Sequence, residues 1–400
     1  MKTRITVVDR LRGISLFGIL AANMLIFQYG IYGKDEMSHY SLLKIDEITH
    51  LVLKIVIESS FMPIFAFLFG YGIIKMQENL KHKQLPVKRY LARRFLLLFI
   101  IGILHSTFLW EGDILTSYGL TGFLLLLFLN RKAKTLLVWA IVMLTLSGLL
   151  GYGSSAEVAT TAEEKEIMSE YVTSTIDIYR NGSFSEIMSH RMNEDPLTEM
   201  LPGGAILLVL LLSPIMLLPM FLFGIIAAKQ QWFLNIDNYQ NRWKKLATGF
   251  VISGILLKMM PYLFPDLGLS GIGYTLGGPL LAFGYIFLFS LLLNNQNNIL
   301  AKGFEAIGRL SLTNYLFQTI VCILIFYGFG LGLFGKLGVL WGVGLTIVIF
   351  SAQMVTSLLY LKTFRIGPFE KILRMWTYFT WSGRIKTANN VKDFDLRQIK

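Results

Sequence analysis

The last long apolar stretch of the chain decides its fold class. Residues 337–361 read LGVLWGVGLTIVIFSAQMVTSLLYL, with no Asp, Glu, Lys or Arg among them. A helix needs about 20 apolar residues, at ~1.5 Å rise each, to cross a hydrocarbon core ~30 Å thick. The sequence therefore predicts a membrane-spanning helix in this stretch.

The same pattern recurs along the chain. Hydrophobic residues make up 54% of the 400 residues and charged residues only 16%, whereas a soluble domain carries roughly 25% charged residues. We therefore expect an all-α integral membrane protein, a bundle of about ten transmembrane helices, and exclude soluble, disordered and disulfide-stapled classes. The predicted spans are 14–33, 49–75, 92–110, 114–130, 135–153, 203–228, 245–264, 271–293, 310–330 and 337–361.

The basic residues predict the orientation. The net charge is +12. If the chain starts in the cytoplasm, the segments that fall on the cytoplasmic side of the predicted spans hold 29 of the 37 Lys and Arg residues; these segments are 2–12, 75–94, 131–134, 229–245, 302–309 and 362–400. An excess of Lys and Arg marks the cytoplasmic side. Both termini are therefore predicted to be cytoplasmic, in a multi-pass protein of a bacterial plasma membrane. Because the basic residues lie in short loops, nucleic-acid binding is not expected.

Four regions follow from this arrangement. Residues 1–153 form an N-terminal membrane half with the candidate site, 154–200 an extracytoplasmic acidic loop, 201–384 a C-terminal membrane half, and 385–400 a cytoplasmic tail. In the acidic loop, the helical spacing of Ile167, Tyr171 and Ile178 favours a short helical cap, although a solvated loop stays open as an alternative. Residues 368–379 place Phe369, Ile372, Leu373, Trp376 and Phe379 on one face, which predicts an amphipathic helix in the inner interface.

Ionisable groups inside spans are costly and usually face a cavity or a partner. His105 lies late in the third span, and Glu111 and Asp113 follow that span. A carboxylate beside an imidazole forms a proton-transfer pair, so these three residues are the candidate catalytic set. The alternative is a packing histidine, with Asp113 capping the next helix.

Further polar residues suggest a substrate site. Glu58 lies beside two serines and Pro63, where it could line a cavity or pair with Lys54 one turn earlier. Asn314 and Gln318 share one face of the ninth span, and interhelical hydrogen bonding is the default explanation for such a pair. Lys258 is expected to extend outward to the interface. The candidate substrate-binding residues are Glu58, Tyr118, Asn314 and Gln318.

The start of the first span carries a short motif of charged residues. Asp9 and Arg12 are spaced to pair on one helix, Arg12 could instead bind a phosphate group, and Asn23 follows on the same helix. Asp9, Arg12 and Asn23 are therefore the candidate cofactor-binding residues. The histidines at 39, 50, 82, 105 and 190 show no ligand spacing on one helix, so no metal site is predicted.

Several of these motifs resemble known families. Asp9-x-x-Arg12-Gly13 with Asn23, and Phe61-x-Pro63-x-Phe65-x-Phe67-x-x-Gly70, resemble the heparan-α-glucosaminide N-acetyltransferase family. A closer resemblance is to the YeiB-like family of bacterial membrane proteins, which has a C-terminal domain of unknown function. It rests on Leu104-His105, Trp110-Glu111-Gly112-Asp113-Ile114-Leu115-x-x-Tyr118-Gly119, Gly308-Arg309-Leu310-Ser311-Leu312-Thr313-Asn314-Tyr315-x-x-Gln318, and Phe364-Arg365-x-Gly367-Pro368-x-Glu370 with Arg374-x-x-Thr377-Tyr378.

The wider group implies an acyl-CoA donor reached from the cytoplasm and an acceptor modified at the outer face. The chain departs from the acyltransferase-3 branch, which has a histidine where Asn23 stands. The acetyltransferase family's own proposed histidine follows its first span, where His39 and His50 are the alternatives here.

Two functions remain open. An acyltransferase would use His105 as base, Asp113 or Glu111 to orient it, and Arg12 or the loop at Arg89, Arg93 and Arg94 for the CoA phosphates. A proton-coupled transporter or exporter of a small molecule or lipid would line its cavity with Glu58, His105, Asp113 and Asn314. The repeat of Phe-Leu-Phe-Gly at 67–70 and 221–224 supports the second function, since some transporters contain parallel repeats. Expected partners are the bilayer and a small-molecule, glycan or lipid acceptor, and a homodimer is left open.

Overall fold

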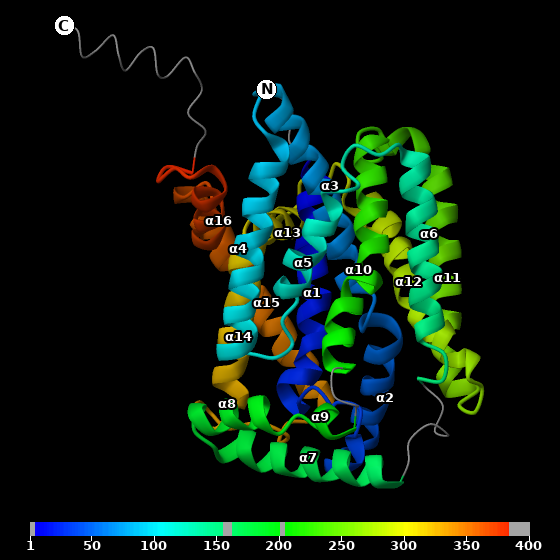
Figure 1. Ribbon diagram of the computed structural model, residues 1–400, viewed down its shortest axis with the longest axis vertical. Coiled ribbons are helices and arrows are strands. Elements are labelled where there is room, and N and C mark those ends of the chain that lie inside the picture. Colours follow the sequence, from blue (N-terminus) through cyan, green and yellow to red (C-terminus); the bar gives the residue numbers. More distant parts are fainter. Residues whose placement is uncertain (1–4, 155–161, 201–204, 384–400) are drawn as a thin grey trace, which may run out of the picture.

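The computed structural model describes residues 5–154, 162–200 and 205–383. These residues form a bundle of long helices, and three shorter helices lie across one end of it (Figure 1). We call this end the capped end. The described chain begins with α1 (Thr6–Tyr29) toward the opposite end, and its last helix, α16 (Pro368–Tyr378), lies beside that half of the bundle (Figure 1). Within the described ranges there is no β-strand, so the predicted all-helical class is confirmed.

Most of the helices are long. The first half of the chain contains α1 (Thr6–Tyr29), α2 (Lys44–Val52), α3 (Phe61–His82), α4 (Val87–Phe108), α5 (Leu115–Leu125) and α6 (Ala133–Leu150). The cap consists of α7 (Ala162–Asn181), α8 (Phe184–Asn193) and α9 (Leu197–Met200). The second half contains α10 (Ala205–Lys229), α11 (Gln240–Leu263), α12 (Leu269–Leu293), α13 (Ile299–Arg309), α14 (Ser311–Phe326), α15 (Val339–Thr363) and α16 (Pro368–Tyr378).

Among the described residues, seven helices are long and apolar enough to cross a membrane. An eighth is added if α13 and α14, which meet at 89°, form one span. The helix α5 and the segment Met216–Lys229 of α10 are apolar but shorter. Nine of the ten predicted spans each overlap one helix, and the second is divided between α2 and α3. The number of helices that cross the bilayer, and their orientation, stay predictions.

The second predicted span is not one continuous helix. The chain runs from α2 through a π-helical segment at Leu53–Ile57 and breaks before α3, where Ser59 has a left-handed φ of 58°. Pro63 explains the position of the break. In a continuous helix its ring would clash with the carbonyl of residue 59, whereas in the first turn of a new helix a proline is tolerated.

The bend between α13 and α14 is held by a side chain from the far end of the sequence. Glu370 of α16 accepts hydrogen bonds from the backbone N–H groups of Leu312 and Thr313, at 2.8 and 3.1 Å. It also accepts one from the Thr313 hydroxyl at 2.6 Å. These N–H groups have no acceptor within α14, and a carboxylate at a helix N-terminus is favoured by the helix dipole. Glu370 therefore caps α14.

The described part of the acidic loop, residues 162–200, is largely helical, in agreement with the predicted helical cap. Ser183 begins α8 and forms a capping box with Glu186, whose carboxylate accepts from the Ser183 N–H at 2.7 Å. Helices α7 and α8 lie across the capped end of the bundle (Figure 1).

The predicted C-terminal helix is confirmed as α16, with Pro368 in its first turn. Leu373 and Thr377 are buried, and the indole N–H of Trp376 donates to the carbonyl of Arg93 at 2.9 Å. One face of α16 therefore packs against α4. The location of α16 in the membrane interface stays a prediction.

The repeated Phe-Leu-Phe-Gly segments pack against each other. A Cβ on Gly70 would lie 2.1 Å from the carbonyl oxygen of Phe221, and one on Gly224 would lie 1.9 Å from that of Phe67. Helices α3 and α10 run in the same direction (Figure 1). Only glycine permits so close an approach of two helix backbones, so the two segments form one reciprocal contact.

Candidate functional site

The candidate catalytic pair is brought together in the bundle interior. His105 comes from the last turns of α4, and Asp113 lies in the connection before α5. The Nδ1 atom of His105 lies 3.0 Å from Oδ1 of Asp113, and both side chains are 1% exposed. The Nδ1 atom has no hydrogen-bond partner among the described residues, so the carboxylate approaches the ring nitrogen without forming a well-aligned hydrogen bond.

Asp113 serves two neighbours at once. Its Oδ2 atom accepts from the backbone N–H of Thr116 at 2.8 Å and from the Thr116 hydroxyl at 2.9 Å. This bond satisfies a free N–H of the first turn of α5. The two alternative predictions for Asp113, capping α5 and facing His105, are therefore both realised, each by a different oxygen.

Two residues of α14 complete the environment of the pair. The Nε2 atom of His105 lies 3.0 Å from the hydroxyl oxygen of Thr319. The Tyr315 hydroxyl donates to Oδ1 of Asp113 at 3.5 Å and accepts from the Ile114 N–H at 3.2 Å. Sequence analysis missed Thr319 as a site residue, although it directly follows Gln318, because no spacing rule links α4 to a helix more than 200 positions away.

Glu111 is not part of this group. Its carboxylate faces the cap, where it accepts from Nη1 of Arg191 at 3.1 Å and from the Tyr179 hydroxyl at 3.2 Å. Arg191 also donates to the carbonyls of Leu109 and Thr107, at 3.2 and 3.0 Å. In this structure Glu111 holds the cap on the α4–α5 connection and does not orient His105.

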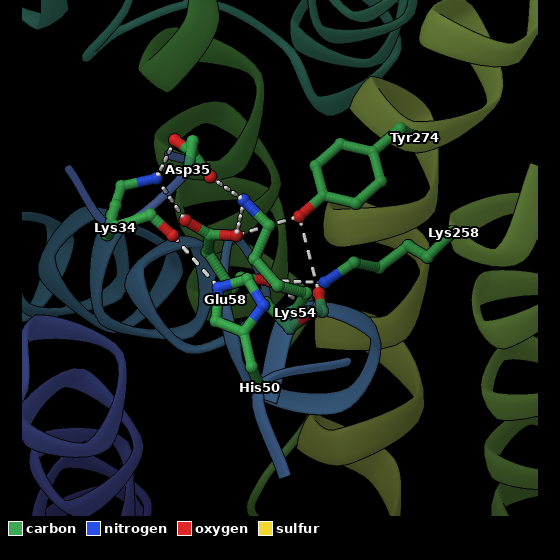
Figure 2. Close-up of polar contacts among 8 residues, drawn as sticks. Lys34, Asp35, His50, Lys54, Glu58, Lys258 and Tyr274 are labelled. Carbon is green, nitrogen blue, oxygen red and sulfur yellow. Dashed lines mark hydrogen bonds and ion pairs between the residues drawn. The ribbon is translucent and has the colours of Figure 1, made fainter. Parts of the chain in front are cut away.

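A second polar cluster lies at the capped end, around the break before α3. In it, Glu58 accepts from Lys34 and from Lys54, each at 2.8 Å, and from the Tyr274 hydroxyl at 2.9 Å (Figure 2). Asp35 also pairs with both lysines. The expected pairing of Glu58 with Lys54 is therefore present, within a ring of two cations and two anions that sequence spacing did not predict.

Lys258 corrects one expectation. It was expected to extend outward, but it is fully buried in α11, and its ammonium group donates to the backbone carbonyl of Glu58 and, at 3.4 Å, to the Ser60 hydroxyl. It also lies 5.2 Å from the centre of the Tyr274 ring (Figure 2). The break before α3 leaves carbonyls without helical partners, and a cation is favoured at such a C-terminal helix end.

The other candidate substrate residues lie elsewhere. Asn314 donates to the Ser357 hydroxyl at 3.1 Å, and Gln318 donates to the side-chain oxygen of Gln353 at 2.9 Å. These bonds join α14 to α15, which is the default explanation for such residues. Tyr118 is buried, and its hydroxyl donates to the Met62 carbonyl at 3.1 Å. The structure therefore does not gather Glu58, Tyr118, Asn314 and Gln318 into one cavity.

The motif at the start of α1 lies at the opposite end from the cap. Arg12 donates to Asp9 at 3.2 Å, as their spacing predicted. Arg94 of α4 lies close enough to Arg12 and to Arg374 of α16 for their charges to repel. Asn23 is partly buried eleven positions beyond Arg12 on α1, roughly 16 Å of helix rise, and does not join them.

The remaining histidine and arginine candidates have structural neighbours. His50 Nε2 lies 2.9 Å from the carbonyl oxygen of Lys34, and His39 Nε2 lies 3.4 Å from the Ser169 hydroxyl of the cap. The guanidinium group of Arg93 lies 4.0 Å from the Phe379 ring centre. In the part of the chain that the structure describes, no three His, Cys, Asp or Glu side chains are grouped so that they could hold a metal ion.

This architecture defines a helical membrane protein whose interior holds buried polar and charged groups. Comparison with known proteins gives its family. Residues 227–380 match the model described as "Protein of unknown function (DUF418)". The chain is 34% identical to "Uncharacterized protein YxaH" of Bacillus subtilis (strain 168) over 387 residues, covering 94% of this chain and 95% of that protein.

A second relative is more distant. The chain is 27% identical to "Uncharacterized protein YeiB" of Escherichia coli (strain K12) over 396 residues, covering 92% and 95% of the two chains. The chain belongs to this YeiB-like family with its DUF418 region, as the sequence motifs indicated.

Proposed function

We propose that this protein is an integral-membrane acyltransferase, which moves an acyl group from cytoplasmic acyl-CoA to an extracytoplasmic or lipid-linked acceptor. The observation that carries the proposal is the buried array of Asp113, His105 and Thr319. A base with a hydroxyl on one ring nitrogen and a carboxylate at the other is the arrangement that acyl transfer requires.

In the proposed reaction the acceptor takes the position beside Nε2 that the Thr319 hydroxyl now holds. His105 removes the proton from the acceptor hydroxyl or amine as this group attacks the thioester carbonyl. The carbon–sulfur bond breaks, and the departing CoA thiolate receives the proton from His105. Asp113 stabilises the imidazolium that forms in between, because a neighbouring carboxylate favours the charged ring.

The buried indole N–H of Trp110 supports a ligand in this region. Trp110 lies two residues beyond the end of α4, and its ring centre lies 6.5 Å from that of His105. Its Nε1 atom is buried and has no hydrogen-bond partner among the described residues. A buried donor without an acceptor is costly, and a bound carbonyl oxygen would satisfy it.

The donor would be held at the opposite end by arginines. Arg12, Arg94 and Arg374 come from three helices, and Arg94 lies close enough to the other two to be repelled by both, with Glu370 also nearby. Arg12 is paired with Asp9. A diphosphate would add charge-assisted hydrogen bonds to these guanidinium groups and offset the repulsion at Arg94. Arg94 and His105 are eleven positions apart on α4, roughly 16 Å of helix rise. The pantetheine arm would have to extend along α4 to bring the thioester to His105.

The test combines binding, activity and stability. Calorimetric titration of the purified protein with acetyl-CoA should release or absorb heat, and Arg94→Gln should weaken binding roughly tenfold or more, since hydrogen bonds to charged groups contribute about 1.5–3 kcal/mol. His105→Ala should abolish transfer and leave binding and thermal unfolding unchanged. If the His105→Ala variant melts several degrees lower than wild type, and wild type shows no heat of binding with any acyl-CoA, the proposal of an acyltransferase is refuted.

A proton-coupled transporter or exporter of a small molecule or lipid is the second candidate. The partly buried ring of Lys34, Asp35, Lys54 and Glu58 at a helix break, together with the reciprocal contact of α3 and α10, favours it. Some transporters build ion sites from discontinuous helices and contain parallel repeats. Proton uptake by proteoliposomes, abolished by Glu58→Gln, would support this function. We further infer a bacterial plasma-membrane location with the bilayer as partner, and leave a homodimer as a proposal that cross-linking can test.

A further inference from the structure

A pocket at the end opposite the cap lies outside the site described above. It is formed where α3 ends, α4 begins and the chain leaves α5, and its volume is about 470 Å³. Its cationic lining residues are Lys81, Lys88 and Arg89, and its polar ones are Gln77 and Asn130. We call it the α3–α4 pocket.

The charge of the α3–α4 pocket is uncompensated. No Asp or Glu lines it, and within the described ranges none of its three cations forms an ion pair. Lys229 of α10 adds a fourth charge, because it lies close enough to Lys81 for the two ammonium groups to repel each other. The Lys229 ammonium group donates a hydrogen bond to the Arg131 carbonyl, at 2.5 Å. Cations gathered around a concave surface concentrate positive potential and attract an anion.

The inner wall of the pocket is rigid and polar. Gln77 is 5% exposed and donates to the side-chain oxygen of Asn130 at 2.9 Å, and Lys81 donates to the same oxygen at 3.4 Å. On the other wall, Lys88 and Arg89 belong to the first turn of α4, which Pro86 leaves without a side-chain cap. The N–H groups of a first helical turn have no acceptor within the helix and favour an anion.

We propose that the α3–α4 pocket binds a phosphate group, carried either by an anionic lipid headgroup or by a soluble phosphate ester. Three cationic side chains with uncapped backbone N–H groups suit the several oxygens of a phosphate. The pocket lies where the apolar parts of α3 and α4 end, and the predicted orientation would place it at headgroup level on the cytoplasmic side. Basic pockets between transmembrane helices on that side bind such headgroups. This proposal does not depend on acyl transfer, because, of the arginines considered above for the CoA phosphates, only Arg89 lines the pocket.

The test measures binding in detergent with two probes. One is dihexanoyl phosphatidylglycerol, with the matching phosphatidylcholine as reference, and the other is inorganic pyrophosphate. The variant Lys81→Gln/Lys88→Gln/Arg89→Gln removes the three pocket charges. The matched control, Arg242→Gln/Lys244→Gln/Lys245→Gln, removes three exposed charges of α11 that do not line the pocket.

We expect the pocket variant to bind its preferred probe at least tenfold more weakly than wild type, since each Lys or Arg near a membrane surface strengthens binding about fivefold. The control should lose less than threefold. Loss for phosphatidylglycerol alone identifies a lipid, and loss for pyrophosphate identifies a soluble ester. Equal losses in both triple variants, or no loss in the pocket variant, would overturn the proposal. Should the triple variant unfold, Arg89→Gln alone must still weaken binding severalfold.

Discussion

Replacing Arg191 by methionine tests whether the cap is locked to the bundle by one side chain. Arg191 makes three hydrogen bonds to the α4–α5 connection, to Glu111 and to the carbonyls of Leu109 and Thr107. Methionine keeps much of the aliphatic stem and removes all three donors. The side chain is 8% exposed in Arg191 and 21% exposed in Glu111, so the pair is only partly screened by solvent.

The size of the effect follows from these contacts. Removing one partner of a buried ion pair costs about 3–5 kcal/mol, and hydrogen bonds to charged groups contribute about 1.5–3 kcal/mol each. Since Glu111 can be rehydrated in part, we expect the cap to lose about 2–4 kcal/mol of stability. Every 1.4 kcal/mol is a factor of ten in an equilibrium, so amide exchange in α7 and α8 should accelerate roughly 30- to 700-fold.

Hydrogen-exchange mass spectrometry in detergent micelles provides the measurement. Arg180→Met is the matched control. Arg180 is also a cap arginine, but among the described residues it donates a single hydrogen bond to the bundle, to the Phe334 carbonyl at 3.1 Å. We expect this control to lose less than about 2 kcal/mol. The double variant with Glu111→Gln should show a coupling of at least about 1 kcal/mol. If exchange in α7 and α8 is as slow as in wild type, or coupling is absent, the cap is held by other contacts.

Three further predictions concern packing, pH and orientation. Gly224→Val should lower the free energy of unfolding by about 1–3 kcal/mol or more, because its Cβ would meet the carbonyl of Phe67. The control Gly344→Val should leave thermal unfolding nearly unchanged, because a Cβ there meets nothing within 4 Å. Equal losses of stability in the two variants would contradict the close approach of α3 and α10. Hydrogen bonds from Ser183 hold the pKa of Glu186 below its usual value. Protection of the α8 amides from exchange should therefore be complete above about pH 4.3 and fall as the pH drops further. Glu186→Gln should abolish this pH dependence, and an unchanged acid profile in the variant would disprove the capping role of Glu186. Cysteines placed at Glu164 and Lys392 in a Cys322→Ala background should be labelled from opposite sides of the membrane, and labelling from one side only would defeat the predicted orientation.

The sequence alone determined the class of the fold. Long apolar stretches can satisfy their backbone hydrogen bonds in a bilayer only as helices, so residues 337–361 had one structural solution, and α15 realises it. The same local reasoning placed α16 at its proline and paired Asp9 with Arg12 three positions later. These features depend on neighbours within a few residues, which periodicity and capping rules describe.

Part of the candidate site was within the same reach. His105 and Asp113 are separated by one short connection, so a turn between two helices could bring them together, and it does. Glu111 lies between them in sequence, yet its side chain faces Arg191 of the cap. Sequence spacing identified the polar residues of this connection as candidates, but it could not predict which partner each of them contacts.

The partners were decided by tertiary structure. Thr319 reaches His105 from α14, Lys258 reaches the break before α3 from α11, and Glu370 caps α14 from the far end of the chain. Each contact joins segments remote in sequence, and its cause is the cost of leaving a buried polar group without a partner. That cost requires a partner to exist but does not identify it, because the packing of whole helices determines which side chain arrives.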